Sequence, residues 1–257
     1  MQIRLRTASF ALLFLVSLPA MAADKVLVYT RNFTKDGKGF VHDNIAACVK
    51  SIKEMAAENG FEADVSEDPA VFSAATLKPY KALVFANSNN EAFATEDQRA
   101  AFKAFIHGGG GFVGIHSSTG SERDWPFFQQ VQGGKFLAHA PLQKFTIKVL
   151  DSAHPATAHL GKTWHWADEC YFFTNLNPDI KVLLALDTSM PLEKFSLEQP
   201  TLGKIKGEFP LAWCHEADGR RSFYTSLGHK IEYYSDPTLR KHLLGGILWV
   251  IAATKQP

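Results

Sequence analysis

The chain has 257 residues, of which 46% are hydrophobic, and its formal net charge is +1 at pH 7. A chain of this length and composition can bury one sizeable core. Basic and acidic residues are nearly balanced and no basic run occurs. The composition therefore predicts no nucleic-acid partner and no other polyanion.

The first 22 residues differ in character from the rest. Arg4 and Arg6 precede a short apolar stretch, residues 11–22, that ends in small residues. This pattern is typical of a cleaved secretory signal peptide, and the apolar part is too short to span a membrane. We predict cleavage after Ala22, with Ala23 as an alternative and a retained N-terminal anchor as a second one. The remaining single domain, residues 23–257, is then periplasmic or secreted, without a membrane anchor.

The first half of the mature chain alternates between strand and helix patterns. Apolar runs predict four strands, at residues 25–30, 61–66, 81–88 and 111–116. Helical spacing and end signals predict two helices, at residues 44–59 and 95–107. Short connections between such elements indicate a parallel sheet covered by helices. Ligands bind such sheets at the carboxyl ends of the strands, which selects the loops 31–44, 88–91 and 116–125.

The second half is less regular. We predict a short helix at residues 125–132, strands at 144–150, 180–187, 210–216 and 220–229, and a long amphipathic helix at 236–254. The predicted fold class is therefore α/β, with a parallel sheet flanked by helices and additional strands in the second half.

Histidines occupy the ends of predicted strands. Three of the ten, His42, His116 and His229, follow segments whose carboxyl ends share one sheet edge. Taken singly, each is explained as a hydrogen-bonded structural residue. Convergence of the three would favour a functional site. His242, in the last helix, is expected to be exposed.

The segment 163–173, TWHWADECYFF, supplies carboxylates among aromatic residues. If it is extended, Glu169 and Tyr171 point to one face and Asp168 to the other. Loss of hydration would raise the pKa of such a carboxylate towards the range that suits proton transfer. The alternative is a solvated turn with acids on its surface.

The sequence lacks the residue patterns of several common kinds of active site. Cys48, Cys170 and Cys214 form no Cys-x-x-Cys pair. They are predicted to be small buried residues, with one disulfide and a leftover thiol as the alternative. No Gly-x-Ser-x-Gly elbow, His-Glu-x-x-His motif or phosphate-binding glycine loop occurs in its required place. We therefore expect no nucleotide cofactor.

Five motifs in order resemble the ThuA-like (trehalose utilisation) family: FVHD, GGGFVGIHSSTG, W…GGKFLAH, HP…DECY and GRRSFYTSLGH. The resemblance covers residues 25–253. It implies the flavodoxin-like fold of the class I glutamine amidotransferase-like group. Related amidotransferases carry a thiol at the turn where this chain has His116, so no glutaminase activity is expected.

The resemblance implies a role in carbohydrate catabolism, on a disaccharide, glycoside or 3-keto-sugar. A 3-keto group acidifies the neighbouring C–H, so a base could start elimination or isomerisation. His116, His229 and Glu169 are the expected proton carriers, and His42 and Asp168 the orienting or binding groups. The predicted substrate-binding residues are Asp43, Ser117, Trp125, His139, Trp166 and Tyr171. The family pattern also picks out His154 and Gly228.

Three function classes remain open on this basis. Acid–base catalysis leads, and a metal-assisted version would use His116, Glu169 and His229 as ligands of a divalent ion such as zinc. A non-catalytic sugar-binding module is the second class. A structural or interaction protein is the third, and it leaves the histidines at the strand ends unexplained.

Overall fold

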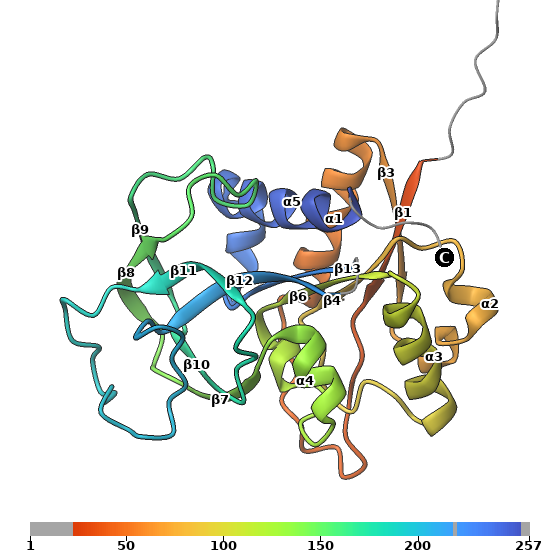
Figure 1. Cartoon of the computed structure of the whole chain (residues 1–257), viewed down its shortest axis with the longest axis horizontal. Helices are drawn as coiled ribbons and strands as arrows, with labels where there is room; N and C mark the ends of the chain where they lie inside the picture. Colours follow the sequence, from red (N-terminus) through yellow and green to blue (C-terminus); the bar gives the residue numbers. More distant parts are fainter. Residues whose placement is uncertain (1–22, 218–219, 253–257) are drawn as a thin grey trace, which may run out of the picture.

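The computed structural model describes residues 23–217 and 220–252, so the predicted signal peptide lies outside the described residues. A nine-stranded sheet runs through the molecule in the order β3-β1-β4-β6-β13-β12-β11-β8-β9 (Figure 1). Its strands are β1 (Asp24–Tyr29), β3 (Phe61–Ser66), β4 (Ala82–Ala86), β6 (Gly111–Ile115), β8 (Gln143–Val149), β9 (Thr163–Asp168), β11 (Lys181–Leu186), β12 (Pro210–Ala217) and β13 (Arg220–Thr225).

The first five strands in this order, β3 to β13, are parallel, and the central strands β4 and β6 bury both faces. Alternate residues explain this: Val84 of β4 packs towards α1 (Ile45–Asn59) and α5 (Pro237–Ile251), and Phe85 packs towards α3 (Glu96–His107) and α4 (Pro126–Gln132). Figure 1 shows these two helix pairs on opposite sides of the sheet. The short α2 (Ala74–Leu77) lies near α3.

Local sequence signals determine where the first helices end or begin. Gly60 ends α1 with φ 74°, in the left-handed region that favours glycine. Thr95 and Gln98 form a reciprocal capping box at the start of α3. Both helices therefore lie where the sequence predicted them.

The remaining strands, β12, β11, β8 and β9, are antiparallel. A separate pair, β7 (Lys135–His139) and β10 (Tyr171–Thr174), is also antiparallel, and β2 (Asn32–Phe33) pairs with β5 (Asn89–Asn90). The sequence patterns did not predict β7, β9 or β10. Their pairing partners lie 15 to 39 residues away in sequence, so local patterning carries little signal for them. The predicted α/β class with additional strands is confirmed.

Two predictions on individual residues have clear outcomes. The three cysteines are free and buried, which confirms the expectation of small core residues. The expected exposure of His242 is wrong, because its side chain is fully buried. It faces Phe223 and Trp164 where α5 covers the sheet.

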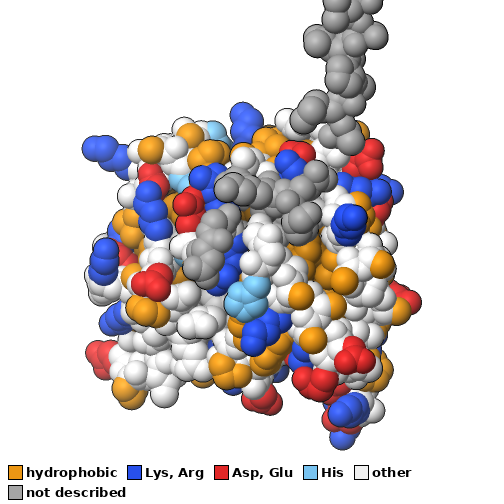
Figure 2. Space-filling view, turned by 45° about the vertical axis from the view of Figure 1, so that its right-hand side comes forward, with side chains coloured by type: hydrophobic (Ala, Val, Ile, Leu, Met, Phe, Trp, Pro, Cys, Tyr) orange, Lys and Arg blue, Asp and Glu red, His pale blue; other side chains and the backbone are white. Residues whose placement is uncertain are grey.

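The surface agrees with the near-neutral composition. On the face shown in Figure 2, basic and acidic side chains are interspersed. Among the described residues, no helix combines the length and apolar character needed to cross a bilayer.

Candidate functional site

The site is built around His116, which follows β6 directly. The backbone of His116 has φ 50°, a conformation that non-glycine residues rarely adopt, and a 3₁₀ turn, His116–Gly120, starts there. The Tyr224 hydroxyl donates to the His116 carbonyl at 2.7 Å and supports this turn. The predicted strand 111–116 thus ends one residue early, and the sharp turn places the imidazole at the carboxyl edge of the sheet.

The two nitrogens of His116 have different roles. Nδ1 lies 2.7 Å from the carbonyl oxygen of Ser226, and a carbonyl can only accept, so Nδ1 carries the proton. In the neutral ring, Nε2 therefore keeps its lone pair. That lone pair faces the Tyr171 hydroxyl at 3.0 Å and Nε2 of His42 at 3.1 Å.

Glu169 connects this pair to a third imidazole. One carboxylate oxygen lies 3.1 Å from Nδ1 of His229 and 3.8 Å from Nε2 of His116. The other oxygen lies 3.5 Å from Nδ1 of His139. His42, His116, Glu169 and His229 each offer one ligand atom, and these atoms all lie within 4.8 Å of one another.

Asp168 holds the segment that carries His229. It is fully buried and accepts hydrogen bonds from the backbone N–H groups of Gly228, at 2.9 Å, and His229, at 3.3 Å. Gly228 has φ 122°, and a Cβ there would lie 2.6 Å from the Tyr234 hydroxyl. The predicted strand 220–229 accordingly ends at Thr225, and the last residues turn towards the site.

Burial and neighbouring charges set opposite protonation states within the cluster. Burial, reinforced by neighbouring imidazoles, holds the pKa of His116 well below its usual value and lowers that of His42 to about 4. The contact with Glu169 raises the pKa of His229. The site therefore combines two neutral imidazoles with one that favours the charged form.

The two carboxylates also differ. Burial raises the pKa of Asp168 to about 6. Burial acts in the same direction on Glu169, but the contact with His229 and the charges of nearby histidines outweigh it, so the pKa of Glu169 is lowered. The predicted upward shift thus occurs at Asp168, the positioning residue, and not at Glu169.

A cavity of about 350 Å³ opens onto this cluster. It is lined by Phe40, His42, Asn89, Ser117, Gly120, Arg123, Phe136, His139, Glu169 and Tyr171. His116 is fully buried and lies behind Tyr171 and His42. This position favours a ligand or positioning role for His116 over direct contact with a substrate.

The donor set fits a divalent transition metal. Three imidazoles and a carboxylate are ligands that zinc and related ions accept. The Ser226 carbonyl orients His116 in the way that backbone carbonyls orient metal-binding histidines. His42 joins the three ligands that the sequence suggested, because its ligand atom lies within 4.8 Å of those of His116, Glu169 and His229.

The predicted substrate-binding residues divide into two groups. Ser117, His139 and Tyr171 line the cavity. Asp43 is exposed and does not line it. Trp125 lines a neighbouring groove, where it packs against Phe93.

Trp166 also lies outside the cavity. It packs beside Tyr233, and its indole N–H donates to Asp168 at 3.0 Å. The family-implied His154 lies elsewhere too, 4.9 Å from Trp249 between ring centroids.

Sequence reasoning missed five cavity-lining residues: Phe40, Asn89, Gly120, Arg123 and Phe136. A signal existed for four of them, because Phe40, Asn89, Gly120 and Arg123 fall in loops selected by the strand-end rule. None of these four side chains carries an imidazole, carboxylate or hydroxyl group, so residue type gave no signal within those loops.

None of the three cysteines lines the cavity. Cys48 and Cys170 are fully buried, and burial raises the pKa of the Cys48 thiol to about 12. The turn after β6, His116–Gly120, contains no thiol, and the expected lack of glutaminase activity stays a prediction.

Solved structures with the same fold include ThuA-like proteins. One from Bacteroides uniformis is 24% identical, with a TM-score of 0.71, over 94% of this chain and 97% of that one. A second, from Parabacteroides merdae, is 18% identical, with a TM-score of 0.67, over 91% and 92% of the two chains. A cytoplasmic protein from Salmonella typhimurium is 12% identical, with a TM-score of 0.58, over 90% and 99%. These similarities confirm the expected ThuA-like, glutamine amidotransferase-like fold.

No match was found among curated protein sequences. The model of the ThuA family, described as trehalose utilisation, matches residues 25–250. Since this match spans most of the sequence, the chain belongs to the ThuA family.

Proposed function

We propose that this protein is a metal-dependent enzyme that acts on a trehalose-related glycoside, in its 3-keto form. The observation that carries the proposal is the meeting of four ligand atoms, from His42, His116, Glu169 and His229, within 4.8 Å of one another. They come from four distant segments of the chain, and a cavity opens beside them. The family description supplies the carbohydrate context.

The four residues of the cluster would hold the divalent ion. When bound, such an ion polarises a carbonyl oxygen or lowers the pKa of a bound water. The low pKa values of His42 and His116 favour the neutral imidazoles that ligation needs, since a proton would occupy the ligand lone pair.

Proton transfer then falls to groups that face the cavity outside the cluster. His139 lines the cavity, and its side chain is 42% exposed. We assign it the removal of the proton from the carbon beside the keto group. Burial keeps the pKa of Tyr171 well above its usual value, so its hydroxyl stays protonated and can donate. Phe40 and Phe136, which also line the cavity, offer apolar faces for a sugar ring.

Metal content and product analysis test the proposal together. The purified protein, dialysed against zinc or manganese, should hold about one ion per chain by mass spectrometry, and His229→Ala close to none. His107→Ala, a histidine in α3 outside the cluster, is the matched control and should keep its metal. Incubation with 3-keto-trehalose should give a new product by chromatography, lost after chelation and in His139→Ala.

A metal-free acid–base enzyme is the second candidate. It is favoured by the opposite pKa shifts of Glu169 and His229, because paired groups shifted apart can serve as base and acid. Turnover that survives chelation, in protein without a bound ion, would select this version. Binding of trehalose without turnover of any keto-sugar would instead select the sugar-binding module.

We further propose that the protein acts outside the cytoplasm. The support is the N-terminal pattern of arginines, apolar run and small residues. Mass spectrometry of the protein recovered from the periplasm or medium should find a chain starting at Ala23 or one residue later. A chain that keeps Met1 would contradict this.

A further inference from the structure

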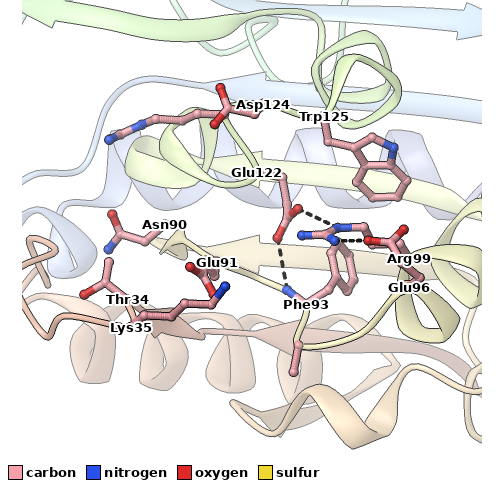
Figure 3. Close-up of a pocket in the computed structure, with 12 residues that line it drawn as sticks. Thr34, Lys35, Asn90, Glu91, Phe93, Glu96, Arg99, Glu122, Asp124 and Trp125 are labelled. Atoms are coloured by element: carbon pink, nitrogen blue, oxygen red, sulfur yellow. Dashed lines mark hydrogen bonds and ion pairs between the residues drawn. The ribbon is translucent and has the colours of Figure 1, made fainter.

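A second cavity lies beside the 350 Å³ cavity at the histidine cluster, which we call the histidine pocket. The proposed reaction makes no use of this second cavity. Its volume is about 610 Å³. Figure 3 shows Glu122, Asp124 and Trp125 along one side and Thr34 and Lys35 along the other. We call this cavity the groove.

Arg123 lines both the groove and the histidine pocket. Its guanidinium donates to Asn89, which lines the pocket, at 3.3 Å, and lies 6.0 Å from the ring centroid of Phe136. The next residue, Asn90, lines the groove. The two cavities are thus neighbours across one exposed side chain, and a molecule bound in the pocket can continue past Arg123 into the groove.

The groove wall is preformed. Glu122 has φ 47° and is 6% exposed, and its carboxylate accepts the backbone N–H groups of Ala92, at 2.9 Å, and Phe93, at 3.1 Å (Figure 3). The same carboxylate binds Arg99 at 2.9 Å. A buried ion pair that fixes a strained backbone lowers the conformational cost of binding at the surface it supports.

The lining has the chemistry of a site for a neutral polyol. Three cationic and four anionic residues line the groove, so neither sign dominates. Arg99 is already paired with Glu96 and Glu122. A phosphate or carboxylate ligand would call for an excess of free cations. A sugar ring needs hydrogen-bond donors and acceptors for its hydroxyl groups and an aromatic ring for its apolar face, and the groove offers these next to Trp125.

We propose that the groove binds a second sugar ring, so that the substrate spans both cavities with one ring at the histidine cluster and the other beside Glu91 and Trp125. This inference rests on the proposed function for the nature of the ligand. It assigns Arg123 to the junction between the rings. It also accounts for Trp125, whose place in the groove separates it from the histidine pocket.

Calorimetric titration of the mature protein with glucose and with trehalose tests the groove without requiring turnover. Trehalose should bind at least about tenfold more tightly than glucose. Glu91→Ala should weaken trehalose binding about tenfold, the worth of one hydrogen bond to a charged group, and leave glucose binding unchanged. Glu67→Ala, an exposed glutamate that lines neither cavity, is the matched control and should behave like the wild type.

The outcomes separate the groove from the chemistry. Equal dissociation constants for the two sugars, unchanged in Glu91→Ala, would overturn the groove as a sugar site even if keto-sugar turnover is found. Groove-dependent binding of trehalose without any turnover would retain the groove and remove the proposed reaction. Arg123→Ala truncates an exposed side chain that lines both cavities, so it should weaken the binding of both sugars. A loss of binding confined to glucose would contradict the placement of Arg123 between the two rings.

Discussion

Two pairs of buried histidines in this molecule look alike by burial and charge, and only one pair belongs to the site. Burial lowers the pKa of His42 to about 4, and it does the same for His154 and His242. His116, the partner of His42, shifts in the same direction. A buried, neutral imidazole is therefore no marker of function by itself.

The difference lies in what the ring nitrogens meet. His154 accepts the backbone N–H of Ala156 at 3.1 Å, and His242 donates to the carbonyl of the same residue at 2.8 Å. The pair thus fastens the His-Pro loop to α5, where a Cβ on Gly245 would lie 2.3 Å from the Pro155 carbonyl oxygen. In the site, by contrast, the nitrogens face one another, a carboxylate and a cavity.

Single substitutions should separate the two pairs most strongly. His116→Ala removes a ligand atom from the cluster, so we expect metal to be lost and turnover of the keto-sugar to fall by at least about 100-fold. His242→Ala should keep its metal and lower the free energy of unfolding by about 2 kcal/mol. Metal analysis and urea unfolding check both variants. Metal loss in His242→Ala at full folding would break the comparison.

Asp168→Asn should give the next largest effect. The carboxylate accepts three backbone N–H groups, from Glu169, Gly228 and His229, through both of its oxygens, and an amide has only one acceptor oxygen. Misplacing His229 should weaken metal affinity about 10- to 100-fold, as for other groups that orient ligands. Competition with a chelator of known affinity measures this. Asp187→Asn, at an exposed carboxylate away from the site, is the control and should bind metal normally.

The pH dependence of stability should reveal the buried histidines of both pairs, because burial lowers the pKa of all four. A histidine with a lower pKa in the folded state binds its proton more readily when unfolded, so stability is lost as the pH falls from about 6.5 towards 4. For His154 and His242 this amounts to about 2 kcal/mol each between pH 7 and pH 5. Asp168 acts in the opposite direction, because burial raises its pKa to about 6.

His242→Gln isolates one contribution from the others. The amide cannot titrate, so the fall in urea midpoint between pH 7 and pH 5 should be smaller in this variant than in the wild type. Equal falls would mean that the buried ring of His242 does not set the pH dependence.

The sequence predicted those parts of the fold and site that local patterns determine. The apolar run before His116 and the capped helix 95–107 follow from adjacent residues alone. The rule that ligands bind at the carboxyl ends of parallel strands also selected the three loops that supply His42, Asn89 and Arg123. The position of β9 in the sheet could not be predicted from adjacent residues, because this strand is defined by its pairing with β8.

Trp125 and Trp166 were predicted to bind the substrate, but neither lines the histidine pocket, because contacts with residues distant in sequence or on the same strand face fix their positions. Trp166 and Asp168 are two residues apart in β9 and share a face, so the indole binds the buried carboxylate and not the cavity. Trp125 precedes α4 and packs on Phe93 and on Phe102 of α3. An aromatic residue near a site in sequence can thus serve the core that supports it.

Asp43→Asn should have the smallest effect, and it tests whether sequence adjacency to a ligand confers a role. Asp43 follows His42 directly, yet its side chain is exposed and does not line the cavity. Its charge favours protonation of His42 and His229 only at a distance and through solvent, which screens it. We therefore expect less than about a twofold change in keto-sugar turnover and less than about 0.5 kcal/mol in stability. A tenfold loss of turnover in the folded, metal-loaded variant would mean that the loop before α1 moves Asp43 onto the substrate. Asp43 would then belong to the site together with His42.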